Sequence, residues 1–130
     1  MNGYSFFAPT KVLFGAGKLN ELGAQKLPGT KALIVTTGGN SVKRFGYLRR
    51  AEAELERAGV AHELFDRIEP NPLRETVNAG GWMARTHGCD FILALGGGSV
   101  MDGSKGICAV AANPHTDAEG NECPGDIWDF

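Results

Sequence analysis

Three short apolar runs punctuate the chain, and each is followed by glycine or proline. They lie at residues 32–35 (ALIV), 60–66 (VAHELFD) and 91–95 (FILAL). Runs of this length, rich in Ile, Leu and Val and bounded by turn residues, are typical of buried strands. The pattern therefore predicts three strands in the core of the protein.

Segments with helical periodicity alternate with these runs. The clearest is 47–58, where an apolar stripe faces a charged side and Gly59 follows as a stop signal; the stripe is Leu48, Ala51, Leu55 and Ala58. Residues 73–87 and 99–112 predict two more helices, the former weakened by Gly80 and Gly81. A short helix is also expected near residues 17–27.

The two ends of the chain have a different character. Residues 1–15 contain two apolar runs around Pro9, which predicts an N-terminal β-hairpin. Residues 113–130 are polar and rich in turn formers, which predicts an irregular tail. With the central β-α-β-α-β-α order, this gives an α/β fold with three layers, α/β/α, around a mostly parallel sheet, in one domain over 1–130.

The loops that follow the predicted strands are expected to meet at one edge of the sheet. In such sheets, ligands bind outside the carboxyl ends of the strands. The glycine-rich loops 38–41 and 96–99 each follow a strand directly, and so does the loop around Asn71. The sequence therefore predicts a ligand site where these three loops converge.

The loop "GGGSVMDGSKG" is neither of the two common phosphate-binding motifs. Its Ser104-Lys105 order is reversed relative to a P-loop, and Met101 stands where G-x-G-x-x-G needs its third glycine. Even so, glycines beside a helix N-terminus suit a pyrophosphate, and the Ser99 hydroxyl can donate. The alternative is a tight turn in which Ser99 and Asp102 form a capping box. Asp102 could also pair with Lys105, three residues on.

The first glycine loop lacks the acid that often binds the ribose of NAD. Residues 36–45 contain no Asp or Glu and instead carry Ser41, Lys43 and Arg44. If a dinucleotide binds, this composition favours a 2′-phosphate, and so NADP(H) over NAD(H). The alternative is a solvated basic patch ahead of a helix.

Composition excludes several other classes of protein. The chain has 130 residues and a net charge of −2, so it offers no basic face for nucleic acid. It has no apolar run of the roughly 20 residues that span a membrane, and its first residues do not resemble a signal peptide. Three cysteines without metal spacing fit reduced thiols in the cytoplasm. The three histidines are isolated, so no metal site is expected.

Five motifs together resemble a known family. They are "PTKVLFGAGKLNEL", "TTGGNSVKRFG", "EPNP", "GGGSVMDGSKG" and the closing "GDIWDF". The chain resembles the N-terminal part of the iron-containing (group III) alcohol dehydrogenases, most nearly the branch of NADPH-dependent butanol dehydrogenases and aldehyde reductases. The resemblance implies a Rossmann-like cofactor domain and transfer of hydride between small alcohols and aldehydes.

The resemblance also implies roles for single residues. Gly97, Gly98 and Ser99 match the pyrophosphate loop. The 2′-phosphate loop is matched by Gly38, Gly39 and Ser41. Asn71 matches a contact on the cofactor side, and Asp102 the residue that faces nicotinamide and substrate. Lys105 also belongs to the matched motif.

The family is much longer than this chain, and the resemblance implies what is missing. Family members hold a divalent metal, iron or zinc, with an aspartate and histidines of a C-terminal all-helical domain that this chain lacks. The expectation is a domain that binds NADP(H) and is inactive alone. The alternative is a catalytically silent module that binds nucleotide or self-associates as a homodimer through exposed apolar surface.

Overall fold

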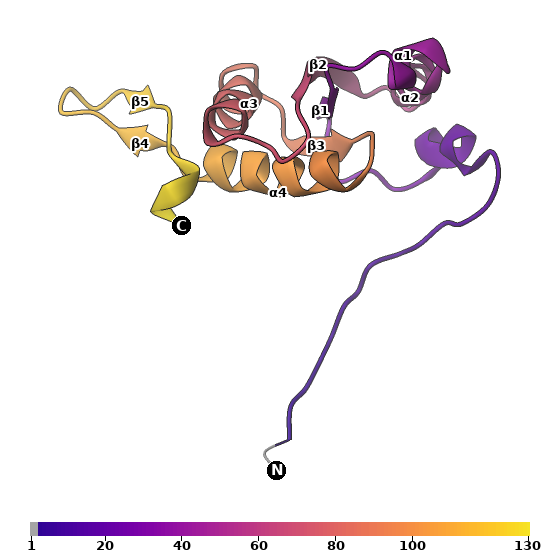
Figure 1. Ribbon diagram of the computed structural model, residues 1–130, viewed down its shortest axis with the longest axis horizontal. Helices are drawn as coiled ribbons and strands as arrows, with labels where there is room; N and C mark the ends of the chain where they lie inside the picture. The colour runs from indigo at the N-terminus through magenta and orange to yellow at the C-terminus, as the bar shows by residue number, and fades with distance from the viewer. Residues whose placement is uncertain (1–2) are drawn as a thin grey trace.

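The structure is a computed structural model that describes residues 3–130 (Figure 1). Between residues 18 and 112 its helices and strands follow the order that the hydrophobic pattern predicts, with the short helix α1 added. They are the 3₁₀ helix η1 (Lys18–Ala24), β1 (Lys31–Thr37), α1 (Ser41–Arg44), α2 (Tyr47–Arg57), β2 (Ala61–Ile68), α3 (Arg74–Thr86), β3 (Phe91–Ala94), α4 (Gly98–Ala112), β4 (His115–Thr116), β5 (Glu122–Cys123) and the 3₁₀ helix η2 (Ile127–Asp129).

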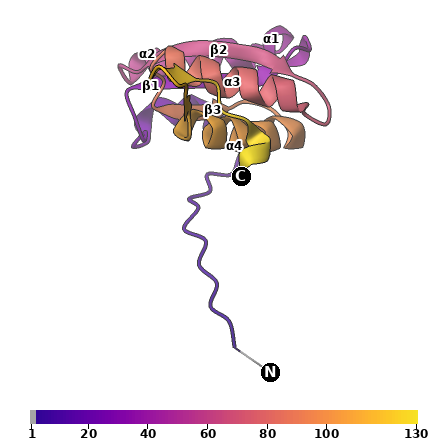
Figure 2. The ribbon, with the colours of Figure 1, turned by 90° about the vertical axis from the view of Figure 1, so that its left-hand side faces the viewer.

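The main sheet is parallel and has the strand order β2-β1-β3. Figures 1 and 2 show it between two layers of helices, with α3 and α4 on one face and α1 and α2 on the other. The predicted three-layer α/β/α arrangement is therefore confirmed. No helix within residues 3–130 combines the length and the apolar character that crossing a bilayer requires.

The central strand β1 is buried on both faces, which explains its unbroken apolar run. Leu33 and Val35 belong to the core cluster under α3 and α4, whereas Ala32 and Ile34 belong to the cluster under α2. All four side chains have no exposed surface. A strand in this position needs apolar residues at every position and not only at alternate ones.

Two glycines expected to weaken α3 are what allow it to pack closely on α4. A Cβ built on Gly80 would lie 2.5 Å from Cδ1 of Ile107, and one on Gly81 would lie 2.5 Å from Cβ of Val110. Both glycines are buried in the helix. Their cost in helix propensity is offset by the contact between the two helices that cover one face of the sheet.

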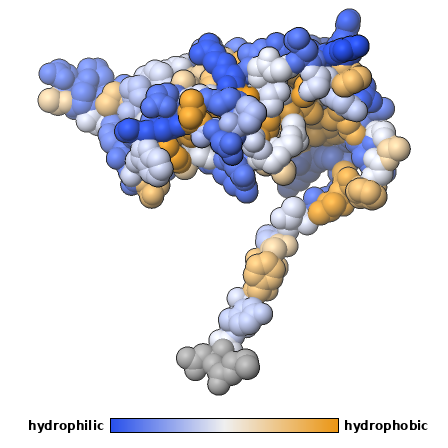
Figure 3. Space-filling view, viewed as in Figure 1, coloured by the Kyte–Doolittle hydropathy of each residue, from blue (hydrophilic) through white to orange (hydrophobic). Residues whose placement is uncertain are grey.

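The predicted N-terminal hairpin is wrong. Residues 3–14 form no strand and extend away from the body of the molecule (Figure 1). Figure 3 shows hydrophobic residues along this segment. Phe6, Phe7 and Phe14 are each more than four-fifths exposed. An isolated pair of short strands is only marginally stable in water, and nothing within residues 3–130 packs against this segment.

The predicted irregular tail is wrong in part. Strands β4 and β5 pair in an antiparallel hairpin, with His115 opposite Cys123. The turn between them is built on Asp117, whose carboxylate accepts from the backbone N–H groups of Glu119 and Asn121 at 3.0 and 2.7 Å. An aspartate turn of this kind is what made the segment look irregular in sequence.

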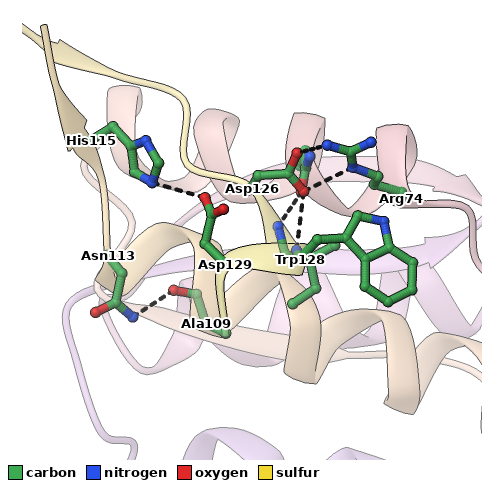
Figure 4. Close-up of polar contacts among 9 residues, drawn as sticks. Arg74, Ala109, Asn113, His115, Asp126, Trp128 and Asp129 are labelled. Carbon is green, nitrogen blue, oxygen red and sulfur yellow. Dashed lines mark hydrogen bonds and ion pairs between the residues drawn. The ribbon is translucent and has the colours of Figure 1, made fainter.

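The end of the chain is fastened to α3 by an ion pair (Figure 4). The Asp126 carboxylate accepts from Nε of Arg74 at 2.9 Å and from the backbone N–H of Trp128 at 3.0 Å. Arg74 holds the pKa of Asp126 far below its usual range. The backbone N–H of Ile127 donates to Oδ1 of Asn78 at 2.9 Å. These bonds place η2, with Trp128, beside α3 and α4.

Candidate functional site

Three adjoining hollows open at the carboxyl edge of the sheet, and Thr37 at the end of β1 lines all three. One of about 400 Å³ includes Ser41, Tyr47 and Gly97. A smaller one of about 170 Å³ is formed by Pro70, Val100 and the loop 97–99. The third, of about 430 Å³, includes Gly38, Gly39, Glu69 and Pro70. The predicted convergence of the three loops is therefore confirmed.

The three glycines at the start of α4, Gly96 to Gly98, have different surroundings. A Cβ on Gly96 would lie 2.5 Å from Cγ2 of Val100, so this position is glycine because of packing. A Cβ on Gly97 or Gly98 would meet no atom of the described residues within 4 Å. These two positions border open space, and a ligand can approach their backbone closely.

The N-terminus of α4 presents its backbone N–H groups to this open space. Gly97 is the N-cap residue, and within the described chain no side chain caps it. The first N–H groups of a helix have no partner inside the helix, and they carry the positive end of its dipole. The arrangement can bind a phosphate group, and the Ser99 hydroxyl lines the same hollow.

The capping-box interpretation of Ser99 and Asp102 is wrong, because Ser99 lies inside the helix rather than at its cap. The pair between Asp102 and Lys105 is confirmed: Nζ of Lys105 lies 3.3 Å from Oδ1 of Asp102. Both side chains are more than 70% exposed. Such a pair contributes little to stability, and it leaves the Asp102 carboxylate accessible.

Asp102 faces a different hollow from the glycines. This hollow has a volume of about 430 Å³ and is lined by Pro72, Arg74, Gly103, Trp128 and Phe130, among others. Its walls are mostly apolar side chains. The structure thus brings Gly38, Gly39, Ser41, Gly97, Gly98 and Ser99 to one rim, and Asp102 to a neighbouring cavity one turn further along α4.

Asn71 lies between the two regions. Its neighbour Pro70 lines hollows on the rim, and Pro72 lines the hollow of Asp102. Asn71 is the one residue other than glycine with a positive φ within residues 3–130, at 56°. Asparagine tolerates this left-handed conformation better than most residues. It lets the loop turn sharply between its two prolines.

An acidic residue of β2 lies beside the loop that follows β1, and sequence reasoning missed it. The ammonium of Lys43, on α1, forms an ion pair with the carboxylate of Asp66, near the end of β2. This contact holds the pKa of Asp66 below its usual value. The rule that parallel strands end at one edge could have found Asp66, because it lies near the end of the second predicted strand.

Within residues 3–130, no three His, Cys, Asp or Glu side chains gather as a metal site would need. Partial burial also raises the pKa of the Cys89 thiol, which makes it a poor thiolate ligand. The described residues therefore do not fit a metal centre.

A parallel α/β sheet with open glycine loops at its carboxyl edge is typical of α/β folds that bind nucleotides. The family comparison is more specific. The family model "Iron-containing alcohol dehydrogenase" matches residues 9–126. The chain belongs to the iron-containing alcohol dehydrogenases.

Relatives named for either coenzyme match the chain. It is 37% identical over 131 residues to a probable NADH-dependent butanol dehydrogenase of Bacillus subtilis (strain 168), covering 100% of this chain and 31% of that protein. It is 40% identical over 114 residues to the NADPH-dependent aldehyde reductase YqhD of Escherichia coli (strain K12), covering 88% of this chain and 29% of that protein.

The structural comparison agrees with the family. The crystal structure of an archaeal halo-thermophilic alcohol dehydrogenase from a Red Sea brine pool superposes with a TM-score of 0.85 at 38% identity, covering 100% of this chain and 31% of that one. The chain therefore spans about a third of the length of the relatives that it matches.

Proposed function

We propose that this chain is the cofactor-binding part of an NADP(H)-dependent, metal-dependent alcohol dehydrogenase or aldehyde reductase. The observation that carries the proposal is the open N-terminus of α4 at Gly97 and Gly98, on the same rim as Ser41, which begins the basic helix α1. The N-terminus of α4 suits the pyrophosphate that NADH and NADPH share. The basic helix α1 suits the 2′-phosphate that only NADPH carries.

In this proposal each group on the rim has one task. The backbone N–H groups at the start of α4 and the Ser99 hydroxyl donate to the pyrophosphate. Gly38 and Gly39 leave room beside the adenosine ribose, while Ser41, Lys43 and Arg44 bind the 2′-phosphate. Asn71 contacts the cofactor where the chain passes toward the second cavity.

Asp102 is placed at the substrate end. It is exposed and lines the mostly apolar cavity beyond the glycine loop, a setting that suits a small alcohol or aldehyde. The bound cofactor would carry the hydride. In the proposal the divalent metal, iron or zinc, belongs to parts of the longer relatives that this chain does not span.

A titration of the 130-residue chain with NADPH and NADH, followed by cofactor fluorescence, tests the cofactor assignment. We expect both cofactors to bind weakly, with Kd values of about 1 mM, because this chain supplies only part of the contacts that a complete cleft makes with the cofactor. NADPH should bind more tightly. A lack of binding at millimolar NADPH, or tighter binding of NADH, would contradict the proposal.

A second candidate function is a catalytically silent module that binds nucleotide or self-associates. Two observations favour it: residues 3–130 hold no cluster of metal ligands, and Phe6, Phe7 and Phe14 are exposed on an extended segment. Butanal reduction with NADPH and added Fe²⁺ or Zn²⁺ separates the candidates. Turnover that Asp102→Ala abolishes would exclude the silent module.

Light scattering tests the self-association. The silent module predicts a homodimer that becomes monomeric when Phe6, Phe7 and Phe14 are all replaced by serine. A wild-type chain that is monomeric at all concentrations would remove this part of the second candidate.

A further inference from the structure

Strand β2 is irregular where it reaches the candidate site. Val35 pairs with Phe65, and the next pair joins Thr37 to Ile68. Between these pairs β1 has one residue and β2 has two, Asp66 and Arg67, so β2 bulges there. Bulges occur preferentially beside functional sites, where they redirect a side chain. The redirected residues here lie at the carboxyl edge of the sheet.

The bulge places Asp66 against the first glycine loop. A Cβ on Gly38 would lie 3.2 Å from the backbone oxygen of Asp66, so the loop and the strand are in close contact. The Asp66 carboxylate holds the Lys43 ammonium. Their side chains keep 34% and 44% of their surface exposed, respectively. Both side chains therefore keep part of their surface in contact with solvent beside this loop.

This ion pair changes the charge that a ligand meets at the loop. Lys43 and Arg44 on α1 and Arg67 on β2 bring three positive charges to this loop, and Arg67 lines the hollow of Gly38 and Gly39. The one negative charge of Asp66 offsets the charge of Lys43, so a 2′-phosphate meets a weaker attraction there. A ribose 2′-hydroxyl carries no charge, so it does not depend on this attraction, and it can donate to a carboxylate.

We propose that Asp66 is a specificity-determining residue, which lowers the affinity for a nucleotide 2′-phosphate by holding Lys43 and so limits the preference for NADPH over NADH. The inference rests on the proposed function, because it needs the adenosine ribose to lie at Gly38 and Gly39. The inference adds Asp66 of β2 to the residues of the two glycine loops that determine which cofactor binds.

Asp66→Asn tests the inference, because it keeps the shape and removes the charge. An exposed ion pair has a coupling of up to about 1 kcal/mol, so releasing Lys43 should improve NADPH affinity about fivefold. NADH affinity should stay within about twofold or fall. Cofactor fluorescence measures both values on the 130-residue chain, and circular dichroism confirms that each variant is folded.

Glu63→Gln is the matched control. Glu63 lies on the same strand, and its carboxylate is 3.0 Å from Nζ of Lys31, but it is near the start of β2 rather than at the rim. The variant also removes one negative charge and one lysine partner. We expect it to leave the ratio of NADPH to NADH affinity unchanged.

The Lys43→Met background tests the route through Lys43. There, Asp66→Asn should raise NADPH affinity by less than about twofold, since no ammonium remains to be released. A gain that stays fivefold in this background, or a wild-type background in which Asp66→Asn behaves like Glu63→Gln, would overturn the inference alone. A wild-type chain that binds neither cofactor would instead overturn the proposed function on which it rests.

Discussion

The two ends of the parallel sheet use glycine for opposite purposes. At the amino end, the Asp90 carboxylate accepts from the backbone N–H of Thr30 at 2.8 Å, from its hydroxyl at 2.9 Å and from the N–H of Lys31 at 2.8 Å. Gly29 lies against this cluster, where a Cβ would be 2.3 Å from Oδ1 of Asp90. At the carboxyl end, a Cβ on Gly97 would meet no described atom within 4 Å.

This difference separates groups that stabilise the fold from groups left available to a ligand. The polar groups of the amino end bond to one another, so glycine there makes room for the protein's own side chain. At the carboxyl end, α4 begins without a side-chain cap, and glycine leaves room for something else. A backbone donor that the fold does not use is available for binding.

Gly29→Ala should have the largest effect, and it should fall on stability. The added methyl group must displace the Asp90 carboxylate from its bonds or shift the strand. Overpacking of this kind lowers the free energy of unfolding by about 1–3 kcal/mol, which urea denaturation measures. NADPH affinity of the folded protein should not change. Unaltered stability would mean that the amino end is as open as the rim.

Gly97→Val should instead weaken cofactor binding and leave the stability of the fold nearly unchanged. Its backbone, at φ −95° and ψ −159°, suits a β-branched residue, so the fold should tolerate the change. The side chain would occupy the space proposed for the pyrophosphate and weaken NADPH and NADH equally, at least about tenfold or 1.4 kcal/mol. Fluorescence titration and thermal unfolding test both parts.

Gly96→Val is the control for this prediction. Its side chain would collide with Val100, so we expect lower stability at a position only one residue away. If Gly97→Val destabilised the protein as much as Gly96→Val does, the distinction between the two glycines would be lost.

Sequence reasoning found what depends on short stretches of chain. The apolar run of β1, the stripe of α2 and the glycine loop before α4 are each encoded within a few residues, and each lies where the pattern predicts. The N-terminal hairpin fails for the same reason. The two apolar runs around Pro9 indicate strand propensity, but a strand also needs a partner and a covered face.

The candidate site was harder to predict where it joins distant segments. The pattern "GGG" cannot show that Gly96 contacts Val100 while Gly97 faces open space. Equally, the absence of acids from residues 36–45 suggested a purely basic loop, yet β2 brings Asp66 to Lys43. That pairing depends on a bulge, and a bulge depends on the register between strands, which a local pattern does not specify.

Salt should distinguish the side-chain contacts at the rim from the backbone contacts. Raising the salt concentration from 0.1 to 1 M shortens the Debye length from about 10 to about 3 Å. Lys43 is 44% exposed, so its attraction for a 2′-phosphate is screened. The ratio of NADPH to NADH affinity should fall about threefold, since the shared pyrophosphate cancels in the ratio. A ratio independent of salt would contradict a charged 2′-phosphate subsite.

The smallest effect should be the pH dependence of the amino end. Backbone N–H groups of Thr30 and Lys31 hold the pKa of Asp90 below its ordinary value of 3.8. The ionised carboxylate therefore stabilises the fold above about pH 3.8, and this contribution is lost as the pH falls through the lowered pKa.

Asp90→Asn removes the contribution at every pH, so wild type and variant should differ in melting temperature most at pH 5–7. The difference should shrink as the pH falls below about 3.8, because the unfolded chain then takes up a proton that the folded carboxylate resists. Thermal unfolding at pH 7, 5, 4 and 3 measures it. A gap that widens on acidification would show that Asp90 is not held in its ionised form, and the amino end of the sheet would then lack the closed set of bonds that sets it apart from the rim.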